Sequence, residues 1–357
     1  MLIYQFAGEY ELRNGWSCAT IQRMEWDFVG NEWAVQMLQN QVVQGSTRHA
    51  YILAGAQGTG KRTLALRFIQ ALNCPAAVST GNPCMECRSC RQVNAMQFPD
   101  MQVVETLAEK SEISIEQIRQ VQQFLSLTPY EAKAKTALFL NFQQAKESAQ
   151  NALLKTLEES PGSSRLIITT DSTEHLLPTI ISRCEVLSLR PVAAREVAFA
   201  LVSRINVEGQ LAELLGHISS GRYGYARLLA EEPDLLEQRS TWLDDWIEIF
   251  SMNRRQRFKY IENKLPRRME LKKQRAAWTA MINCWMSFSR DMLLNSSGAA
   301  AEPMNMDRKA DIAKLAGRLG AEKTTRIIHS LEKASERIDG YCNSRLVMET
   351  LMLELGD

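Results

Sequence analysis

The chain lacks both an excess of charge of one sign and any long apolar run. Its 42 Lys and Arg residues are balanced by 41 Asp and Glu residues, so the net charge is +1. No bulk electrostatic field therefore favours nucleic acid as a partner, and any such contact must come from a local patch or from an assembly of several chains. No apolar run approaches the roughly 20 residues that cross a bilayer. We expect a soluble cytoplasmic protein with no membrane partner.

The N-terminal residues 1–23 lack the pattern of a signal peptide. Glu9, Glu11 and Arg13 interrupt the only apolar stretch of this segment, whereas a signal peptide needs an uninterrupted apolar region. A better-patterned segment begins at Met24. We therefore treat residues 1–23 as an N-terminal extension of uncertain role and draw no function from them.

The eight cysteines are unevenly distributed, and four of them crowd together at Cys74, Cys84, Cys87 and Cys90. In a reducing compartment, such a cluster indicates metal ligation rather than disulfides. Four thiolates at these spacings can surround one tetrahedral Zn²⁺ ion and leave no open position for chemistry. The sequence predicts a structural zinc module at residues 74–90, with four free cysteines as the alternative.

Residues 24–191 alternate between segments with helical and strand-like patterns. Short apolar runs stand at 51–54, 137–140 and 166–169, and apolar residues recur at helical spacing over 33–43 and 63–72. Apolar strands between helices are typical of a parallel sheet that is buried on both faces. The predicted fold class is α/β.

The strand signals stop after Pro191. Residues 192–232 are expected to form a small helical unit, and residues 233–357 a helical bundle, with an exposed loop at Asn295–Pro303. We expect the aromatic residues of the bundle to anchor its core: Trp242, Trp246, Phe250, Trp278 and Trp285.

A glycine-rich loop follows the first apolar run and precedes a helical segment. Gly55, Gly58, Gly60 and Lys61 match the phosphate-binding loop in the strand–loop–helix context that makes such a match credible. Its glycines let backbone N–H groups turn toward phosphate oxygens, and the lysine adds a positive charge. The alternative is a glycine-rich turn that binds nothing.

Two departures argue against ATP hydrolysis at this loop. Arg62 occupies the position where a Ser or Thr hydroxyl holds Mg²⁺. Thr63 is displaced by about 100° around the helix and is not expected to replace that hydroxyl. The apolar run at 137–140 is followed by Asn141 and glutamines, without the carboxylates that complete a metal site. Nucleotide binding at Lys61 stays open from the sequence, and we expect that ATP is not hydrolysed here.

Several longer motifs resemble the clamp-loader family of bacterial DNA polymerase III, a group of AAA+ proteins. They are RHAYIL at 48–53, NALLKTLEE at 151–159, IISRC at 180–184 and NSRL at 343–346. The resemblance covers roughly residues 24–357. It implies an AAA+ P-loop domain at 24–191 with the inserted zinc module, a helical lid domain at 192–232, and an all-α collar domain for oligomerisation at 233–357.

The resemblance also implies a role for Arg183. In this family, the arginine of the Ser-Arg-Cys motif reaches the ATP site of a neighbouring subunit, where it stabilises charge on the transferring phosphoryl group. A surface salt bridge is the alternative role. Active subunits carry a sensor arginine at the position of Gly224, although Arg222 and Arg227 stand nearby. This pattern fits the delta-prime type, whose implied partners are the gamma or tau motor subunits, the delta subunit, the sliding clamp and primer–template DNA.

Two other functions stay open from the sequence. One is an ATP-hydrolysing motor subunit of the gamma or tau type with an altered loop, for which Lys61→Ala should abolish activity of the complex. The other is an AAA-like scaffold of a different assembly, against which co-purification with a sliding clamp would argue.

Overall fold

The computed structural model describes residues 25–106, 112–159, 164–264, 270–340 and 342–355. The predicted N-terminal extension at 1–23 lies outside these residues. The chain divides into two compact units: residues up to 209 with 221–226, and residues 210–220 with 227 onward. The domain boundaries expected from the sequence at 191 and 232 stay a prediction.

The first unit is built on a parallel sheet. Its strands are β1 (Ala50–Ala54), β2 (Met101–Val104), β3 (Lys135–Phe139), β4 (Ser164–Thr170) and β5 (Glu185–Ser188). They lie in the order β2-β3-β4-β1-β5, and every pairing is parallel. The predicted α/β class with a parallel sheet is confirmed.

Both faces of the sheet are buried, and strand β1 shows how its sequence achieves this. Tyr51 and Leu53 belong to one apolar core, whereas Ala50, Ile52 and Ala54 belong to the core on the other face. Successive side chains of a strand point to opposite faces, so an uninterrupted apolar run supplies both cores at once.

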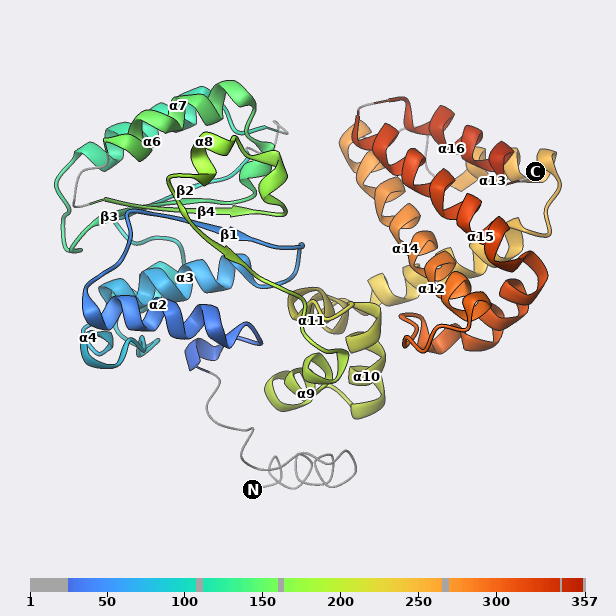
Figure 1. Ribbon diagram of the computed structural model, residues 1–357, viewed down its shortest axis with the longest axis horizontal. Helices are drawn as coiled ribbons and strands as arrows, with labels where there is room; N and C mark the ends of the chain where they lie inside the picture. Colours follow the sequence, from blue (N-terminus) through green and yellow to red (C-terminus); the bar gives the residue numbers. More distant parts are fainter. Residues whose placement is uncertain (1–24, 107–111, 160–163, 265–269, 341, 356–357) are drawn as a thin grey trace. The chain divides into compact units, whose positions relative to one another are not determined.

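Two layers of helices cover these faces (Figure 1). The helices on one face are α2 (Glu32–Gln44), α3 (Lys61–Asn73), α4 (Ala77–Thr80) and α5 (Arg88–Asn94). Those on the other face are α6 (Ile115–Ser126), α7 (Glu147–Glu158) and α8 (Pro178–Ile181).

The strands extend slightly beyond the apolar runs that predicted them. β1, β3 and β4 were expected, but β3 begins at Lys135 and ends at Phe139 rather than spanning 137–140. The edge strands β2 and β5 were not predicted. Each has only four residues and is incompletely buried, so neither carries the continuous apolar run by which a central strand is identified.

Three helices follow the sheet in the sequence: α9 (Ala194–Ile205), α10 (Gly209–Ile218) and α11 (Tyr223–Glu231). Their presence agrees with the helical segment expected after Pro191. The start of α11 lies in the first unit, and most of α10 lies in the second unit. No helix among the described residues is long and apolar enough to cross a membrane.

The second unit is helical. After part of the preceding helices it contains α12 (Pro233–Ile249), α13 (Arg254–Lys264), α14 (Leu271–Ser297), α15 (Lys309–Asp339) and α16 (Ser344–Glu354). The expected aromatic core is present: the rings of Trp246 and Trp285 are stacked with centroids 4.6 Å apart, and both side chains are fully buried. The predicted loop at Asn295–Pro303 was placed too early, because α14 continues to Ser297 and ends at Gly298 with φ +66°.

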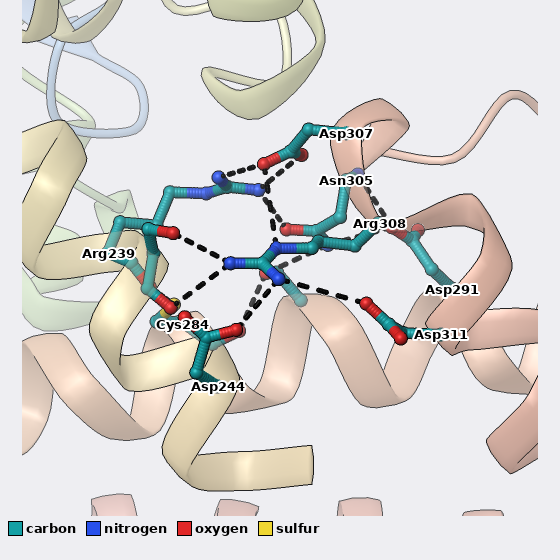
Figure 2. A network of polar contacts seen from close by, with 10 residues as sticks. Arg239, Asp244, Cys284, Asp291, Asn305, Asp307, Arg308 and Asp311 are labelled. Carbon is teal, nitrogen blue, oxygen red and sulfur yellow. Dashed lines mark hydrogen bonds and ion pairs between the residues drawn. The ribbon is translucent and has the colours of Figure 1, made fainter.

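A polar network holds the connection between α14 and α15 inside this unit (Figure 2). The guanidinium of Arg239 donates to both carboxylate oxygens of Asp307, at 2.8 and 3.0 Å, and to the side-chain oxygen of Asn305 at 2.6 Å. Asn305 in turn donates to Asp291 of α14 at 2.8 Å. Burial alone would raise the pKa of Asp307, but its bonds to Arg239 hold that pKa below the ordinary value.

Candidate functional site

The glycine-rich loop connects the end of β1 to the start of α3, as its sequence predicted. Gly60 has φ +94°, and a Cβ atom there would lie 2.6 Å from the ring of Phe28. A side chain at this position is therefore excluded both by backbone conformation and by space. The loop has the strand–loop–helix geometry of a phosphate-binding loop.

Lys61 is turned back onto its own loop. Its ammonium donates to the carbonyl oxygens of Gly55 and Ala56, the second at 3.2 Å, and to Asp171 Oδ1 at 2.7 Å. The residue is buried, with a relative exposure of 7%. Three acceptors from its own chain match the three donors of a lysine ammonium, so a phosphate would have to displace at least one of them.

Asp171 is the functional-site residue that the sequence analysis missed. It directly follows β4, and β4 pairs with β1 in parallel, with Thr170 opposite Ala54. The carboxyl ends of neighbouring parallel strands meet at one edge of the sheet, which brings Asp171 beside the phosphate loop. An acidic residue at the end of the third apolar run was the available signal, but the partner strand could not be read from the sequence.

The segment after β3 places an amide, rather than a carboxylate, at this edge. Gln143 donates to Asp171 Oδ2 at 2.8 Å, so Lys61 and Gln143 hold the two oxygens of one carboxylate. Asn141 has φ +54°, and its backbone N–H donates to the hydroxyl of Thr169 at 3.0 Å. The sequence has no acidic residue between positions 140 and 146. In the structure, Gln143 of this segment bonds to Asp171, the acidic residue that directly follows β4.

Arg62 and Thr63 are exposed at the start of α3. A terminal nitrogen of Arg62 lies 3.3 Å from the sulfur of Met96. Lys61, by contrast, is turned toward the sheet edge. Within the described part of the chain, neither Arg62 nor Thr63 bonds to the atoms that surround Lys61, as expected from the rotation of successive residues around a helix.

The start of α11 closes on the phosphate loop. The backbone N–H of Gly224 donates to the carbonyl oxygen of Gly58 at 2.8 Å. A Cβ atom at 224 would lie only 2.9 Å from that oxygen, so this approach requires glycine. The sensor arginine expected at this position in an active subunit could not be accommodated here without moving the start of α11. Arg222 instead lies over the ring of Tyr225, 4.9 Å from its centroid.

Arg183 lies just after the short helix α8, whose position depends on a buried glutamine. Gln150 of α7 donates to the carbonyl of His175 at 3.0 Å and accepts from the backbone N–H of Leu177 at 2.9 Å. Pro178 then occupies the first turn of α8, where a missing N–H costs nothing. These contacts hold the Ser182–Cys184 motif against α7.

The side chain of Arg183 meets the second signature motif. One terminal nitrogen donates to the carbonyl of Thr179 at 2.9 Å, and the other lies 2.7 Å from Glu158 Oε1. The side chains of Arg183 and Glu158 are 37% and 51% exposed. Glu158 is part of the 151–159 motif, so the two motifs that carried the family resemblance touch through this pair, a contact that the sequence did not predict.

The four clustered cysteines converge in the structure. Their sulfur atoms all lie within 4.8 Å of one another, and Cys74 Sγ is 3.5 Å from Cys84 Sγ. Sulfurs at about 2.3 Å from a tetrahedral Zn²⁺ would be separated by about 3.8 Å, so the four thiols fit one such ion. Backbone N–H groups of Cys87 and Glu86 lower the pKa of Cys84 to about 6, whereas burial raises the pKa of Cys90.

The cysteine module is joined to the phosphate-loop helix and to the segment before α2. Gln70 of α3 donates to the carbonyl of Cys90 at 2.7 Å, and Trp26 Nε1 donates to the carbonyl of Gly81 at 2.9 Å. Cys74 and Cys90 are themselves buried in the core on this face of the sheet. The module is thus packed into the core on this face of the sheet instead of forming a separate loop.

Comparison with known proteins identifies relatives for this chain. A family model described as "DNA polymerase III, delta subunit" matches residues 30–193. The chain is 25% identical to DNA polymerase III subunit delta' of Bacillus subtilis over 323 residues, covering 90% of this chain and 95% of the relative. It is also 25% identical to subunit tau of B. subtilis, but covers only 61% of that protein, and 29% identical to subunit tau of Escherichia coli, of which it covers 28%. The resemblance to clamp-loader subunits of DNA polymerase III is confirmed.

Solved structures with a similar chain path include two proteins from this group. A gamma subunit-related protein of Thermotoga maritima is 15% identical, with a TM-score of 0.39, and the match covers 90% of this chain and 99% of that one. The clamp loader delta protein of B. subtilis is 13% identical, with a TM-score of 0.33 over the same shares. At these scores the likeness carries no argument about function.

Proposed function

We propose that this chain is a clamp-loader subunit of DNA polymerase III of the delta-prime type, which does not hydrolyse ATP and contributes Arg183 to the ATP site of a neighbouring motor subunit. The match that spans nearly all of both chains, to the delta' subunit of B. subtilis, supports this type. The proposed partners are gamma or tau motor subunits, the delta subunit, the sliding clamp and primer–template DNA, in the cytoplasm.

The observation that carries the proposal is the engagement of Lys61 by its own chain. Asp171 and two loop carbonyls take up its ammonium, and Gln143 takes the other carboxylate oxygen. Mg²⁺ is held in competent loops by a hydroxyl and an acidic residue, whereas the corresponding residues here are Arg62 and the amide-bearing segment after β3. Bound nucleotide would have to compete with these contacts, and the metal would lack its ligands.

Arg183 is suited to act on a neighbour because its present partner is weak and exposed. An ion pair at the surface contributes about 0–1 kcal/mol, so exchanging Glu158 for a phosphoryl group costs little. The bond from one terminal nitrogen to the Thr179 carbonyl meanwhile holds one side of the guanidinium at the surface. A planar guanidinium that reaches the γ-phosphoryl group of ATP stabilises the charge that develops there during transfer.

We further propose that Cys74, Cys84, Cys87 and Cys90 hold one structural Zn²⁺ ion. All four positions of a tetrahedral site would be filled by thiolates, which leaves none for water or substrate. The ion would cross-link the end of α3 to the segment up to α5. Its proposed role is to fix the shape of the module on the core and not to contact DNA.

The test is the ATPase activity of the isolated chain and of the complex reconstituted with motor subunits, DNA and clamp. We expect no turnover by the isolated chain, a large loss in the complex that contains Arg183→Ala, and little change with Lys61→Ala. Substantial turnover by the chain alone, or full activity with Arg183→Ala, would overturn the proposal.

A motor subunit is the second candidate, because several relatives are gamma or tau subunits with up to 31% identity. Three of these matches cover 44–53% of this chain and 28–50% of the relatives' length. Under this alternative, Lys61→Ala would abolish ATP hydrolysis by the complex. A scaffold in an unrelated assembly is disfavoured, since the relatives named above are all subunits of DNA polymerase III.

A further inference from the structure

The second unit contains a concentration of positive charge that the proposed function does not use. Residues 254–273 hold nine lysines and arginines and two glutamates, a net charge of +7, although the whole chain has a net charge of only +1. The described part of this stretch is α13 and the start of α14. A cluster of charges this dense usually forms a solvated helix face. Which side of the helix carries these charges therefore decides whether they could bind a ligand.

Helix α13 is held by its apolar side and by one buried arginine. Ile261 and Arg257 are buried, and Arg257 donates to the carbonyl of Ile249 at 3.1 Å and to that of Met352 at 3.3 Å. These carbonyls lie in the last turns of α12 and α16, where the negative end of each helix dipole favours a cation. Arg257 therefore has a structural role, and it fixes which side of α13 faces outward.

Arg255 and Lys259 lie on the side opposite to this buried face. Ile261 and Arg257 lie about 40° apart around the helix, and Arg255 and Lys259, also about 40° apart, point almost directly away from them at 100° per residue. Both are exposed, and within the part of the chain that the structure describes neither has an ion pair. They form an outward ridge of two cations about 6 Å apart along the helix axis.

Lys264 and Glu262 of α13 are paired with residues other than Arg255 and Lys259. Lys264 pairs with Asp245 of α12, which also accepts from the hydroxyl of Tyr260. Glu262 lies beside the ridge and faces Arg345 of α16 at 3.8 Å. Glu262, the acid beside the ridge, thus faces a cation other than Arg255 and Lys259, both of which are exposed to solvent.

We propose that this ridge of α13, Arg255 and Lys259, binds the phosphate backbone of nucleic acid. A second ligand class, an acidic segment of another protein, fits less well, because protein interfaces rely on buried apolar and aromatic anchors. Arg255 and Lys259 are flanked on the outward face by Gln256, Glu262 and Asn263, all exposed and none apolar. Contacts to phosphate need only cations at the surface and carry no sequence preference.

The test is the binding of the full chain to a fluorescein-labelled oligothymidylate, followed by anisotropy over a series of salt concentrations. We expect binding at low salt that weakens as salt rises. Arg255→Glu with Lys259→Glu should weaken it at least about tenfold and reduce the slope of log K against log salt by about 1.4, the value for two lost contacts on single-stranded DNA.

The matched control is Arg326→Glu with Lys333→Glu, which removes the same residue types from exposed positions of α15 and changes the charge equally. We expect it to bind within about twofold of the unmodified chain, because its cations lie on another helix. Equal losses in the two variants, no binding at low salt, or equally tight binding of a polyglutamate peptide would each overturn the proposal. Arg183→Ala should bind the oligonucleotide normally, so failure here is separable from failure of the proposed ATPase role.

Discussion

Two cations of the first unit, Lys61 and Arg183, are each paired with a carboxylate, yet the two cations differ in how exposed they are to solvent. The Lys61 side chain is 8% exposed and bonds to Asp171 and two backbone carbonyls. The Arg183 side chain is 37% exposed and bonds to Glu158, one carbonyl and a neighbouring hydroxyl. Both residues belong to motifs that the proposed function connects with phosphate, so the contrast between them bears on that proposal.

The difference shows that a cation of a motif is available to bind a ligand only where its bonds within the chain can be exchanged at low cost. Lys61 lies where the edge of the sheet and the loop converge, so removing its ammonium would take a donor from Asp171 Oδ1 and from two loop carbonyls. Arg183 lies at the end of α8, where water can replace Glu158 at little cost. On the proposed function, the first cation is retained inside the subunit and the second is offered to another subunit.

A third pair extends the comparison to complete burial. Asp100 is fully buried and accepts from Lys135 at 3.0 Å and from the backbone N–H groups of Tyr130, Glu131 and Ala132. Burial alone would raise its pKa, but these donors lower it to about 2. This pair shapes the turn before β3 and is not available to any ligand.

The largest effect is expected from removing the proposed metal ion from the cysteine module, which is packed against the helix that begins at Lys61. We expect one Zn²⁺ ion per chain by atomic emission, and its removal by a chelator should cost on the order of 10 kcal/mol of local folding free energy. Cys90→Ser should lose the metal, and the exposed Cys342→Ser should keep it. Full metal content in Cys90→Ser would contradict the ligand assignment.

Arg183→Ala tests whether the exposed cation of the pair acts on the ATP of a neighbouring subunit. We expect the ATPase rate of the reconstituted complex to fall by about 10³, because the charge on the phosphoryl group loses its stabilising guanidinium. Glu158→Ala is the matched control, since it removes only the partner within the chain, and should retain nearly full activity. Equal losses in the two variants would mean that the pair supports structure and that Arg183 is not offered to a neighbour.

The buried pair predicts a dependence of stability on pH. The pKa of Asp100 is lowered in the folded state, so its contribution is present above the unfolded pKa of 3.8 and is lost as pH falls toward about 2. We expect Asp100→Asn to lower the free energy of unfolding by about 2 kcal/mol near neutral pH. The gap between variant and unmodified chain, measured by urea unfolding, should narrow below about pH 4. A gap that is constant down to pH 2 would contradict this.

Asp171→Ala tests whether Lys61 is restrained by its partners, and the effect expected is the smallest. Releasing the ammonium and removing a nearby negative charge should tighten the binding of a fluorescent ATP analogue about fivefold, within the range of one charged hydrogen bond. Glu174→Ala, an exposed acid three residues later, should leave binding unchanged. If Asp171→Ala also leaves binding of the analogue unchanged, then burial, and not the Asp171 carboxylate, keeps Lys61 from binding nucleotide.

Much of the fold was predictable because its signals are local. The central strands carry continuous apolar runs, the phosphate loop carries its glycines, and the four cysteines stand close together in the sequence. The edge strands β2 and β5 were missed because four incompletely buried residues give no clear pattern. The packing of the cysteine module into the core was also not foreseen, since Gln70 and Trp26 hold it from outside the segment 74–90.

The sequence by itself determined that Lys61 is followed by Arg62, that no acid follows β3, and that Arg183 stands in its motif. Only the tertiary structure decided where these cations point. Asp171 reaches Lys61 because β4 pairs with β1, and Gly224 reaches Gly58 because α11 begins against the loop. Such contacts join residues more than 100 positions apart, and a spacing in the sequence cannot encode them because they arise from the order of strands and the packing of helices.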